Sequence, residues 1–265
     1  MKVTAIILKY KKSNEELAER LKYLVEVCGI DEFFIASNSG KYNIGTAGGY
    51  TIGMKQVKDG FIWLLDEDNI PEPNALKMLK YNWEQWGGVY IGWGDKKRYL
   101  CLASYRKGYD KISDIWSVVG SENSVLGLNL FNYKQTRNNL KPRPLQCFAD
   151  SYNRKIPVAM YGGMFFHSDL LKAIGYPNEK LFMYCDDFDW SYKISSIVLV
   201  KDSIINEPES KGNLYYNTRN HLIFQKQFVT NRFKFWINYQ AYRLYLIYKR
   251  DFQKLKALRD GWNFN

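Results

Sequence analysis

The sequence has few of the residues that build zinc sites and disulfide frameworks. It contains four cysteines, none of them in a CxxC pair, and two histidines. These numbers argue against the usual zinc-ligand spacings and against a small domain held together by disulfides. No run of about 18 consecutive apolar residues occurs, and the apolar run at the N-terminus is too short for a signal peptide. We therefore expect a cytoplasmic protein with reduced cysteines.

What the sequence does have is enough apolar material for one large folded domain. Of the 265 residues, 46% are hydrophobic and 25% are charged, which is typical of a chain that buries a core. Aromatic residues make up 17% of the chain and include 21 tyrosines. Tyr and Trp pack cores, and they also suit sites that stack on sugars and bases.

The positive charge is concentrated near the C-terminus. The net charge is +11, and residues 219–259 hold ten Lys or Arg against one acid, which leaves +2 for the rest of the chain. A basic segment rich in aromatics is typical of nucleic-acid-binding proteins and of helices that lie on an anionic membrane. Composition alone leaves both alternatives open.

The hydrophobic pattern of the first third alternates between strands and helices. Ser13 and Glu16 form a capping box at the start of a helix that Gly29 ends, with Leu17, Leu21, Leu24, Val25 and Cys28 on one face. The other elements expected here are strands at residues 3–8, 32–37, 61–65 and 89–93, and helices at 46–57 and within 71–85. This alternation indicates βαβ units and a mainly parallel sheet.

The remainder of the chain is less regular. Residues 95–153 are expected to form loops and short elements over the sheet. Residues 156–168 are strand-like, Ser168 begins a short helix that ends at Gly175, and residues 186–196 predict another helix. From Tyr215 onward the pattern indicates aromatic, basic helix.

An acidic cluster directly follows the apolar run at residues 61–65. Acids at the carboxyl end of a buried strand lie where open α/β sheets bind ligands. Asp66 and Asp68, two apart on an extended chain, are expected to point the same way and to hold one hard cation, which in turn holds a diphosphate. An acidic turn that opens the following helix explains the same residues equally well.

Two further segments contain residues suited to chemistry. Residues 43–53 are rich in glycine, which permits close approach of a phosphate or close packing of a helix on the sheet, but they match neither the P-loop nor the dinucleotide pattern. Asp186, Asp187 and Asp189 place three carboxylates within four residues. Such crowding raises a pKa and suits a general base, although capping of a helix N-terminus by these acids is the commoner explanation of a lone DDxD.

Taken together and in order, these segments resemble family 2 glycosyltransferases of the GT-A fold, in particular the bacterial rhamnosyltransferase and galactofuranosyltransferase branch. That branch reads N-x-G-x-A-G-G-x-x-x-G, D-x-D-x-x-P, G-G-x-F-F, D-D-x-[DE] and Y-Y-x-x-R-N. The matching segments here are residues 43–53, 66–71, 162–166, 186–189 and 215–220.

The resemblance implies an α/β, Rossmann-like GT-A fold, with a mainly parallel mixed sheet flanked by helices. Residues 1–215 would form the catalytic domain, with a nucleotide-sugar half at about 1–95 and an acceptor half at about 96–215. Residues 216–265 would form a basic, aromatic helical segment packed on that domain.

The resemblance also implies residue roles. Asp66 and Asp68 would hold Mn²⁺ or Mg²⁺ against the donor diphosphate. Asp187 would deprotonate the acceptor hydroxyl, with Asp186 and Asp189 supporting it or binding the acceptor. The residues expected to bind the donor are Leu8, Tyr10, Ser37, Asn38, Asn43, Gly48, Gly49, Glu67 and Gly163.

Two positions depart from the family pattern. Many relatives carry Asp where Ser37 stands, in the region that holds the nucleobase. Relatives often have a metal-binding His before the Y-Y-x-x-R-N segment, whereas residues 204–209 contain none. His221, which directly follows the motif, is the candidate to replace it.

The predicted function is an inverting, metal-dependent hexosyltransferase of bacterial-type polysaccharide or glycolipid synthesis. It would move galactofuranose or rhamnose from a UDP- or dTDP-linked donor to a carbohydrate or lipid-linked acceptor. The alternatives are a sugar nucleotidyltransferase, which should carry a basic glycine-rich loop that residues 10–12 match poorly, and a non-catalytic nucleic-acid or membrane-surface binding protein. For the tail we predict an anionic membrane surface and no nucleic acid, because its aromatics suit the headgroup level. The enzyme would then lie in the cytoplasm, peripheral on the inner face of the membrane.

Overall fold

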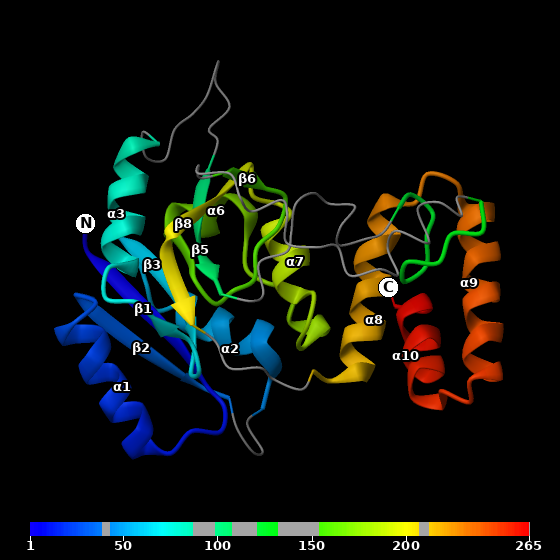
Figure 1. Cartoon of the computed structure of the whole chain (residues 1–265), viewed down its shortest axis with the longest axis horizontal. Coiled ribbons are helices and arrows are strands. Elements are labelled where there is room, and N and C mark those ends of the chain that lie inside the picture. The colour runs from blue at the N-terminus through cyan, green and yellow to red at the C-terminus, as the bar shows by residue number, and fades with distance from the viewer. Residues whose placement is uncertain (39–42, 87–98, 108–120, 132–153, 207–211, 265) are drawn as a thin grey trace. The chain divides into compact units, whose positions relative to one another are not determined.

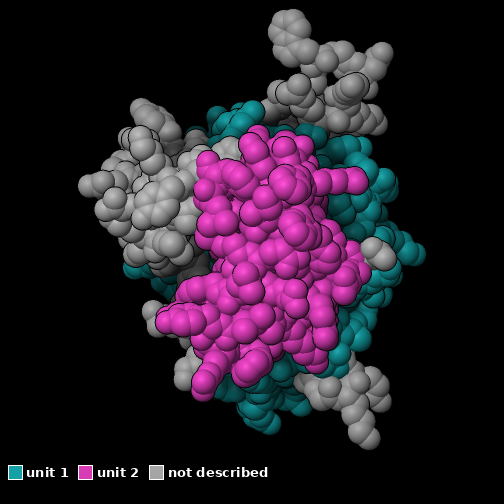
Figure 2. Space-filling view, turned by 90° about the vertical axis from the view of Figure 1, so that its right-hand side faces the viewer, with its two compact units in different colours: residues 1–110, 151–182, 186–209 teal, residues 111–150, 183–185, 210–265 magenta. Residues whose placement is uncertain are grey.

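The computed structural model describes residues 1–38, 43–86, 99–107, 121–131, 154–206 and 212–264 (Figure 1). The chain divides into two compact units, coloured separately in Figure 2. We call the first the sheet unit, and it comprises Met1–Asp110, Ser151–Phe182 and Asp186–Glu209. We call the second the helical unit, and it comprises Lys111–Asp150, Met183–Cys185 and Ser210–Asn265.

The sheet unit is built on a mixed eight-stranded sheet of order β2-β1-β3-β7-β5-β8-β4, with β6 paired to β8. Strand β1 is parallel to β2 and β3, and β5 is parallel to β8. Strand β7 runs antiparallel to both β3 and β5 and joins the two parallel groups. The strands are β1 (Val3–Lys9), β2 (Glu32–Ser37), β3 (Phe61–Asp66), β4 (Ile70–Pro71), β5 (Leu100–Arg106), β6 (Arg154–Ile156), β7 (Met164–His167) and β8 (Ser196–Asn206).

Helices cover both faces of this sheet. On one face, α1 (Asn14–Glu26) and α3 (Ala75–Gln85) share a core with alternate residues of β1 and β3. On the other face, α2 (Gly45–Met54) approaches β1 so closely that a Cβ on Gly53 would lie 2.3 Å from Ile6 Cγ2. The shorter helices of the unit are α6 (Asp169–Ile174), η3 (Glu179–Leu181) and α7 (Asp186–Ser191). The arrangement is a three-layer α/β fold.

The start of the sheet unit follows the sequence pattern closely. The Ser13 hydroxyl accepts from the Glu16 amide and the Glu16 carboxylate accepts from the Ser13 amide, so the predicted capping box is confirmed. The predicted strand at residues 32–37 is confirmed as β2. Val25, expected on the buried face of α1, is instead 44% exposed, because the helix turns it away from the sheet.

Several predictions for the later chain were wrong. Residues 100–106 were expected among loops and short elements over the sheet, yet they form β5 within it, between β7 and β8. The helix expected at residues 186–196 ends at Ser191, and Ser196 begins the long strand β8. Both strands are buried on both faces for much of their length, so they lack the alternation that marks a half-exposed strand. The strand-like segment 156–168 is split into the end of β6 and β7. The strand expected at residues 89–93 lies outside the described residues.

The described part of the helical unit contains α8 (Leu214–Gln225), η4 (Lys226–Phe228), α9 (Arg232–Tyr248) and α10 (Phe252–Trp262). Helices α8 and α10 pack closely, since a Cβ on Gly261 would lie 2.7 Å from the Arg219 carbonyl oxygen. The small core of the unit holds Val125, Leu222, Phe235, Tyr239, Leu246 and Leu258. Among the helices that the structure describes, none is both long and apolar enough to span a bilayer.

Candidate functional site

The carboxyl ends of β1, β2 and β3 form the edge at which most predicted donor residues gather. In the parallel register, Leu8 of β1 pairs with Asp66 of β3, and Lys9 pairs with Ser37 of β2. The chain passes from β1 outward to β2 and then returns to β3 on the other side of β1. In open α/β sheets, ligands usually bind in the crevice outside the carboxyl ends of the strands, at such a reversal of strand order.

The acidic cluster lies in a turn and not on an extended chain as expected. Asp66 ends β3, Glu67 and Asp68 form the turn, and the Asn69 amide donates to the Asp66 carbonyl at 3.1 Å. The buried Asn69 side chain accepts from the Asp66 amide at 2.8 Å, so it holds the turn from within. The Tyr50 hydroxyl donates to Asp66 Oδ1 at 2.8 Å and fixes that carboxylate.

Glu67 is bound to the loop that follows β1. Its two carboxylate oxygens accept from the backbone amides of Tyr10, Lys11 and Lys12 at 2.7–2.9 Å. Hydrogen bonds of backbone N–H groups to a carboxylate are among the stronger ones in proteins. Glu67 therefore shapes the edge of the crevice by holding this loop, and its predicted contact with the donor stays a prediction.

Asp66 and Asp68 fit a hard divalent cation. Both side chains keep part of their surface open, and no hydrogen bond to Asp68 occurs among the described residues. Gly162 packs closely on this turn, since a Cβ there would lie 2.4 Å from Asn69 Oδ1 and 2.8 Å from Asp66 Oδ2. Within the described ranges no group of three or more His, Cys, Asp and Glu side chains could hold a metal by itself. The pair is thus suited to Mg²⁺ or Mn²⁺, which bind proteins through one or two carboxylates and take waters and phosphate oxygens for the rest.

The glycine-rich helix α2 links the crevice to the second acidic cluster. Gly45 has φ +77°, and a Cβ on it would lie 1.9 Å from the Phe182 carbonyl oxygen. One residue on, the Thr46 hydroxyl donates to Asp186 Oδ2 at 2.7 Å. The space beside Gly49 is filled by Leu8, whose Cδ1 would lie 2.3 Å from a Cβ there. Close packing therefore accounts for Gly45 and Gly49; it was one of the two explanations that the sequence left open for these glycines.

The other predicted donor residues lie in the same unit. Asn38 is buried, and its amide side chain donates to the Gly45 carbonyl at 2.8 Å and accepts from the Ile44 amide at 2.7 Å. The Asn43 side chain accepts from the Gly45 amide at 3.0 Å, while Ser37 is exposed at the end of β2. The last two residues of the set are internal: Gly48 packs on Ile44, and Gly163, with φ +100°, lies against Ser104.

The three acids at the start of α7 have different surroundings. Asp186 is 1% exposed, and burial and the neighbouring Asp187 raise its pKa well above the usual value. Burial raises the pKa of Asp187 to about 7; the charge of Asp66 adds to the rise, and the Phe188 amide and Arg106 oppose it. Asp187 keeps part of its surface open, and Asp189 faces Lys193 at 3.7 Å. A partly accessible carboxyl with a pKa near neutrality is suited to general-base chemistry.

The segment that leads into α7 has a strained backbone. Phe182, Tyr184 and Cys185 have φ values of +70°, +63° and +57°. Each such residue costs about 1–3 kcal/mol unless neighbouring contacts hold it. In the helical unit the buried side chain of Asn220 donates to the carbonyls of Met183 and Tyr184 at 2.7 and 2.9 Å. The Asn of the Y-Y-x-x-R-N segment thus clamps the turn directly before the DDxD acids.

His221 contacts the same segment. Its Nδ1 lies 3.0 Å from Cys185 Sγ and 2.6 Å from Asn217 Oδ1. Burial lowers the pKa of His221, which favours the neutral ring. His221 belongs to the helical unit, and its predicted role as a metal ligand to the Asp66–Asp68 pair stays a prediction.

Sequence reasoning missed two residues beside the acids. Arg106, at the end of β5, is 6% exposed and is the cation that opposes the rise in the pKa of Asp187. Nothing in the local sequence marked it, because β5 itself was missed. Tyr161 is 4% exposed, and its hydroxyl has no hydrogen-bond partner among the described residues. Its place directly before Gly162 and Gly163 was a signal that could have identified it.

The sequence and the fold of this chain can be compared with those of known proteins. No family model matches the sequence, and no curated protein sequence matches it. A crystal structure of S. aureus TarS 1–349 in complex with UDP-GlcNAc has a TM-score of 0.51 and 13% identity, with 98% of this chain and 80% of that chain covered. Another S. aureus TarS structure has a TM-score of 0.50 and 14% identity; the match covers 84% of this chain but 39% of that longer chain. At such identities the likeness is one of fold, and it confirms the predicted mixed α/β fold of the GT-A type.

Proposed function

We propose that this protein is an inverting glycosyltransferase that uses a nucleotide-diphosphate sugar. The observation that carries the proposal is the pairing of two kinds of carboxyl group in one unit. Asp66 and Asp68 are partly exposed acids at the end of β3. The pKa of Asp187 is raised to about 7, and the negative charge of Asp66 contributes to that rise. One site thus combines a cation-binding pair with a group able to accept a proton near neutral pH.

The donor would lie at the carboxyl edge of β1, β2 and β3. Its diphosphate would lie over Asp66 and Asp68, which would hold Mn²⁺ or Mg²⁺; that cation would neutralise charge on the departing nucleoside diphosphate. Glu67 holds the β1 loop in place through three backbone amides, and Tyr50 orients Asp66. These contacts preorganise the binding edge before the donor arrives.

Asp187 would act on the acceptor. As the acceptor oxygen attacks the anomeric carbon, its proton passes to the Asp187 carboxylate. The bond from that carbon to the diphosphate oxygen breaks, and the nucleoside diphosphate leaves with the electron pair. A single in-line displacement inverts the configuration. Arg106 favours the ionised form of Asp187, in which the carboxylate can accept the proton.

The donor class follows from the resemblance of the motifs and from the fold. The resemblance favours UDP-galactofuranose and dTDP-rhamnose. The TarS structure of the same fold was solved with UDP-GlcNAc, which makes that nucleotide sugar a third candidate. A panel of these three donors, with and without Mn²⁺, and with simple glycosides as acceptors, tests the class directly.

Two variants test the residue roles. Asp68→Ala should abolish most turnover and weaken the dependence on added Mn²⁺, because the cation loses a ligand. Asp187→Asn should lose about 10²–10⁴-fold in turnover with donor binding retained, because the amide cannot accept a proton. Asp59→Asn is the control, since that carboxylate is 88% exposed. Undiminished metal-dependent transfer by Asp68→Ala would contradict the metal assignment, and full activity of Asp187→Asn would contradict the base assignment.

An assay with a nucleoside triphosphate and a sugar phosphate, run beside this panel, separates the alternative enzyme. A sugar nucleotidyltransferase would consume a nucleoside triphosphate and a sugar phosphate and release pyrophosphate. Release of pyrophosphate without any transfer from the nucleotide sugars would replace our proposal with this one.

We also propose that the C-terminal half of α9 contacts an anionic membrane surface. Leu244, Tyr245 and Tyr248 are 66%, 50% and 80% exposed, and Phe252 is 68% exposed. The cations Arg243, Lys249 and Arg250 lie among them and are exposed too. Aromatics at the headgroup level next to cations are typical of interfacial binding, and salt should weaken it. Co-sedimentation with anionic and neutral liposomes at low salt, alongside a duplex-DNA binding assay, tests this. Binding to DNA and not to anionic liposomes would overturn it.

A further inference from the structure

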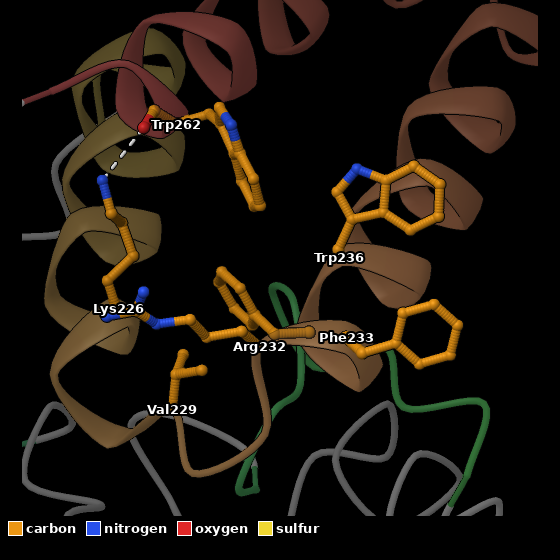
Figure 3. Close-up of a pocket in the computed structure, with 7 residues that line it drawn as sticks. Lys226, Val229, Arg232, Phe233, Trp236 and Trp262 are labelled. Carbon is orange, nitrogen blue, oxygen red and sulfur yellow. Dashed lines mark hydrogen bonds between the residues drawn. The ribbon is translucent and has the colours of Figure 1, made fainter.

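A pocket of about 630 Å³ lies within the helical unit, formed by the turn after α8, the start of α9 and the end of α10 (Figure 3). Its volume is in the usual range for small-molecule sites, roughly 300–1,000 Å³. Four aromatic residues line it, Phe233, Phe235, Trp236 and Trp262, together with the cations Lys226 and Arg232. The proposed transfer reaction uses none of these side chains.

The aromatic wall of the pocket is held rigidly on one side. Trp262 stacks on Phe235 with ring centroids 5.6 Å apart and planes 14° apart, and its ring centroid is 4.1 Å from that of Tyr239. The Lys226 ammonium donates to the Trp262 carbonyl at 2.9 Å, the bond drawn in Figure 3. Trp262 therefore presents a fixed surface, so stacking of a ligand on it costs the protein little side-chain conformational entropy.

The opposite wall is exposed. Trp236 and Phe233 are 47% and 68% exposed, and their rings are nearly parallel, with centroids 6.4 Å apart. Figure 3 shows the indoles of Trp236 and Trp262 on either side of the same open space. A flat ring in this space would meet the face of the Trp262 indole and the edge of the Trp236 indole (Figure 3).

The charge of the pocket is of one sign. Among the residues that the structure describes, Lys226 and Arg232 line it, and no acidic residue does. Lys226 already donates to two backbone carbonyls, those of Trp262 and Phe264. Arg232 is exposed and lines the pocket, and its guanidinium makes no hydrogen bond to any residue that the structure describes. A wholly apolar ligand would strip water from this charge without replacing its hydrogen bonds, whereas an acidic group would pair with it.

We propose that this pocket binds an acidic saccharide, a sugar unit that bears a carboxylate or phosphate group, as part of the acceptor. The choice of a saccharide over other flat anions rests on the proposed glycosyltransferase function. The C–H face of the sugar ring, which carries partial positive charge, lies on the indole face of Trp262, beside the edge of Trp236. The acidic group pairs with Arg232.

Binding is measured directly, without turnover. Oligogalacturonate is the acidic probe, maltohexaose is the neutral probe, and the readouts are tryptophan fluorescence and calorimetry. We expect saturable binding of oligogalacturonate and at least about tenfold weaker binding of maltohexaose. Trp236→Ala should weaken oligogalacturonate binding about tenfold. Arg232→Ala should remove the preference for the acidic probe.

Matched controls come from the same helix. Tyr248→Ala and Arg243→Ala remove an exposed aromatic and an exposed cation outside the pocket, and both should bind oligogalacturonate as the unchanged protein does. Asp68→Ala should also bind it normally, which separates failure of the pocket from failure of the proposed reaction. The proposal is overturned if oligogalacturonate does not bind, or if Trp236→Ala and Arg232→Ala bind it unchanged. Preferential binding of oligo-dT or of anionic vesicles through Arg232 and Trp236 would overturn it as well.

Discussion

Replacing Asn220 by alanine tests how the acids of α7 are held in place. The Asn220 amide donates two hydrogen bonds to the carbonyls of Met183 and Tyr184, and the residue is 1% exposed. Alanine removes both donors and leaves two carbonyls without these partners. From net values of about 0.5–1.5 kcal/mol per hydrogen bond and an added cost for unpaired buried groups, we expect a loss of about 2–4 kcal/mol in the free energy of unfolding.

The expected effect on turnover is larger than a stability loss alone would give. The φ values of Phe182, Tyr184 and Cys185 are all positive, so the segment stores strain that relaxes when the clamp is lost. The next residues along the chain are Asp186 and Asp187. Because a shift of about 1 Å in a catalytic group can cost about 10²-fold in rate, we expect kcat to fall by about that factor.

The assay compares kcat, the donor KM and urea unfolding for two buried asparagines. Asn238 is fully buried in α9, donates to the Asn123 carbonyl at 2.8 Å and accepts from the Leu130 amide at 2.9 Å. Asn238→Ala should therefore lose similar stability and keep its kcat. Asn220→Asp retains the size of the side chain and its acceptor oxygen but cannot donate both bonds, so its kcat should also fall.

One result would refute this reasoning. If Asn220→Ala and Asn238→Ala lose the same stability and both retain kcat at a temperature where each is folded, the clamp is structural only. The strained turn would then hold Asp186 and Asp187 without the help of α8.

Three further predictions concern the sheet unit. Glu67→Ala should free the loop after β1, because three hydrogen bonds to the carboxylate are lost, and it should raise the donor Kd by about tenfold with less effect on kcat. Calorimetry with UDP measures the Kd, and an unchanged value would contradict this prediction. Gly45→Ala should lower the free energy of unfolding by more than about 2 kcal/mol, because the new Cβ would overlap the Phe182 carbonyl. Gly29→Ala is the control, since Gly29 has a similar φ and nothing within 4 Å of the added Cβ, and it should cost about 1 kcal/mol. Equal losses of the two variants in urea unfolding would show that the positive φ alone causes the loss. The pKa of Asp187 is raised from 3.8 to about 7 in the folded state, so between these values the folded state binds a proton that the unfolded state has lost, and the free energy of unfolding falls as pH rises across this window. Asp187→Asn lacks this titration. In EDTA its melting temperature should therefore exceed that of the unchanged protein at pH 8, and the difference should vanish near pH 4.

The sequence by itself determined the local features of this protein. The capping box at Ser13 and the strand at residues 32–37 depend on neighbouring residues, so their patterns predicted them. The acids after β3 were predicted at a strand end, because an uninterrupted apolar run followed by polar residues is a local signal. The ordered motifs predicted the GT-A type of fold, which the likeness to TarS confirms.

The tertiary structure decided how these residues act on one another. Glu67 meets the backbone of Tyr10 across more than fifty positions of sequence, and Asn220 meets Met183 across 37. Arg106 comes to the acids only because β5 enters the sheet beside β7, and that strand lacks alternation since both of its faces are buried. The pKa of Asp187 is likewise set by burial and by charges brought from other strands. A local pattern can name a residue type and its element, but pairings between distant segments depend on the packing of the whole chain, which no short window of sequence contains.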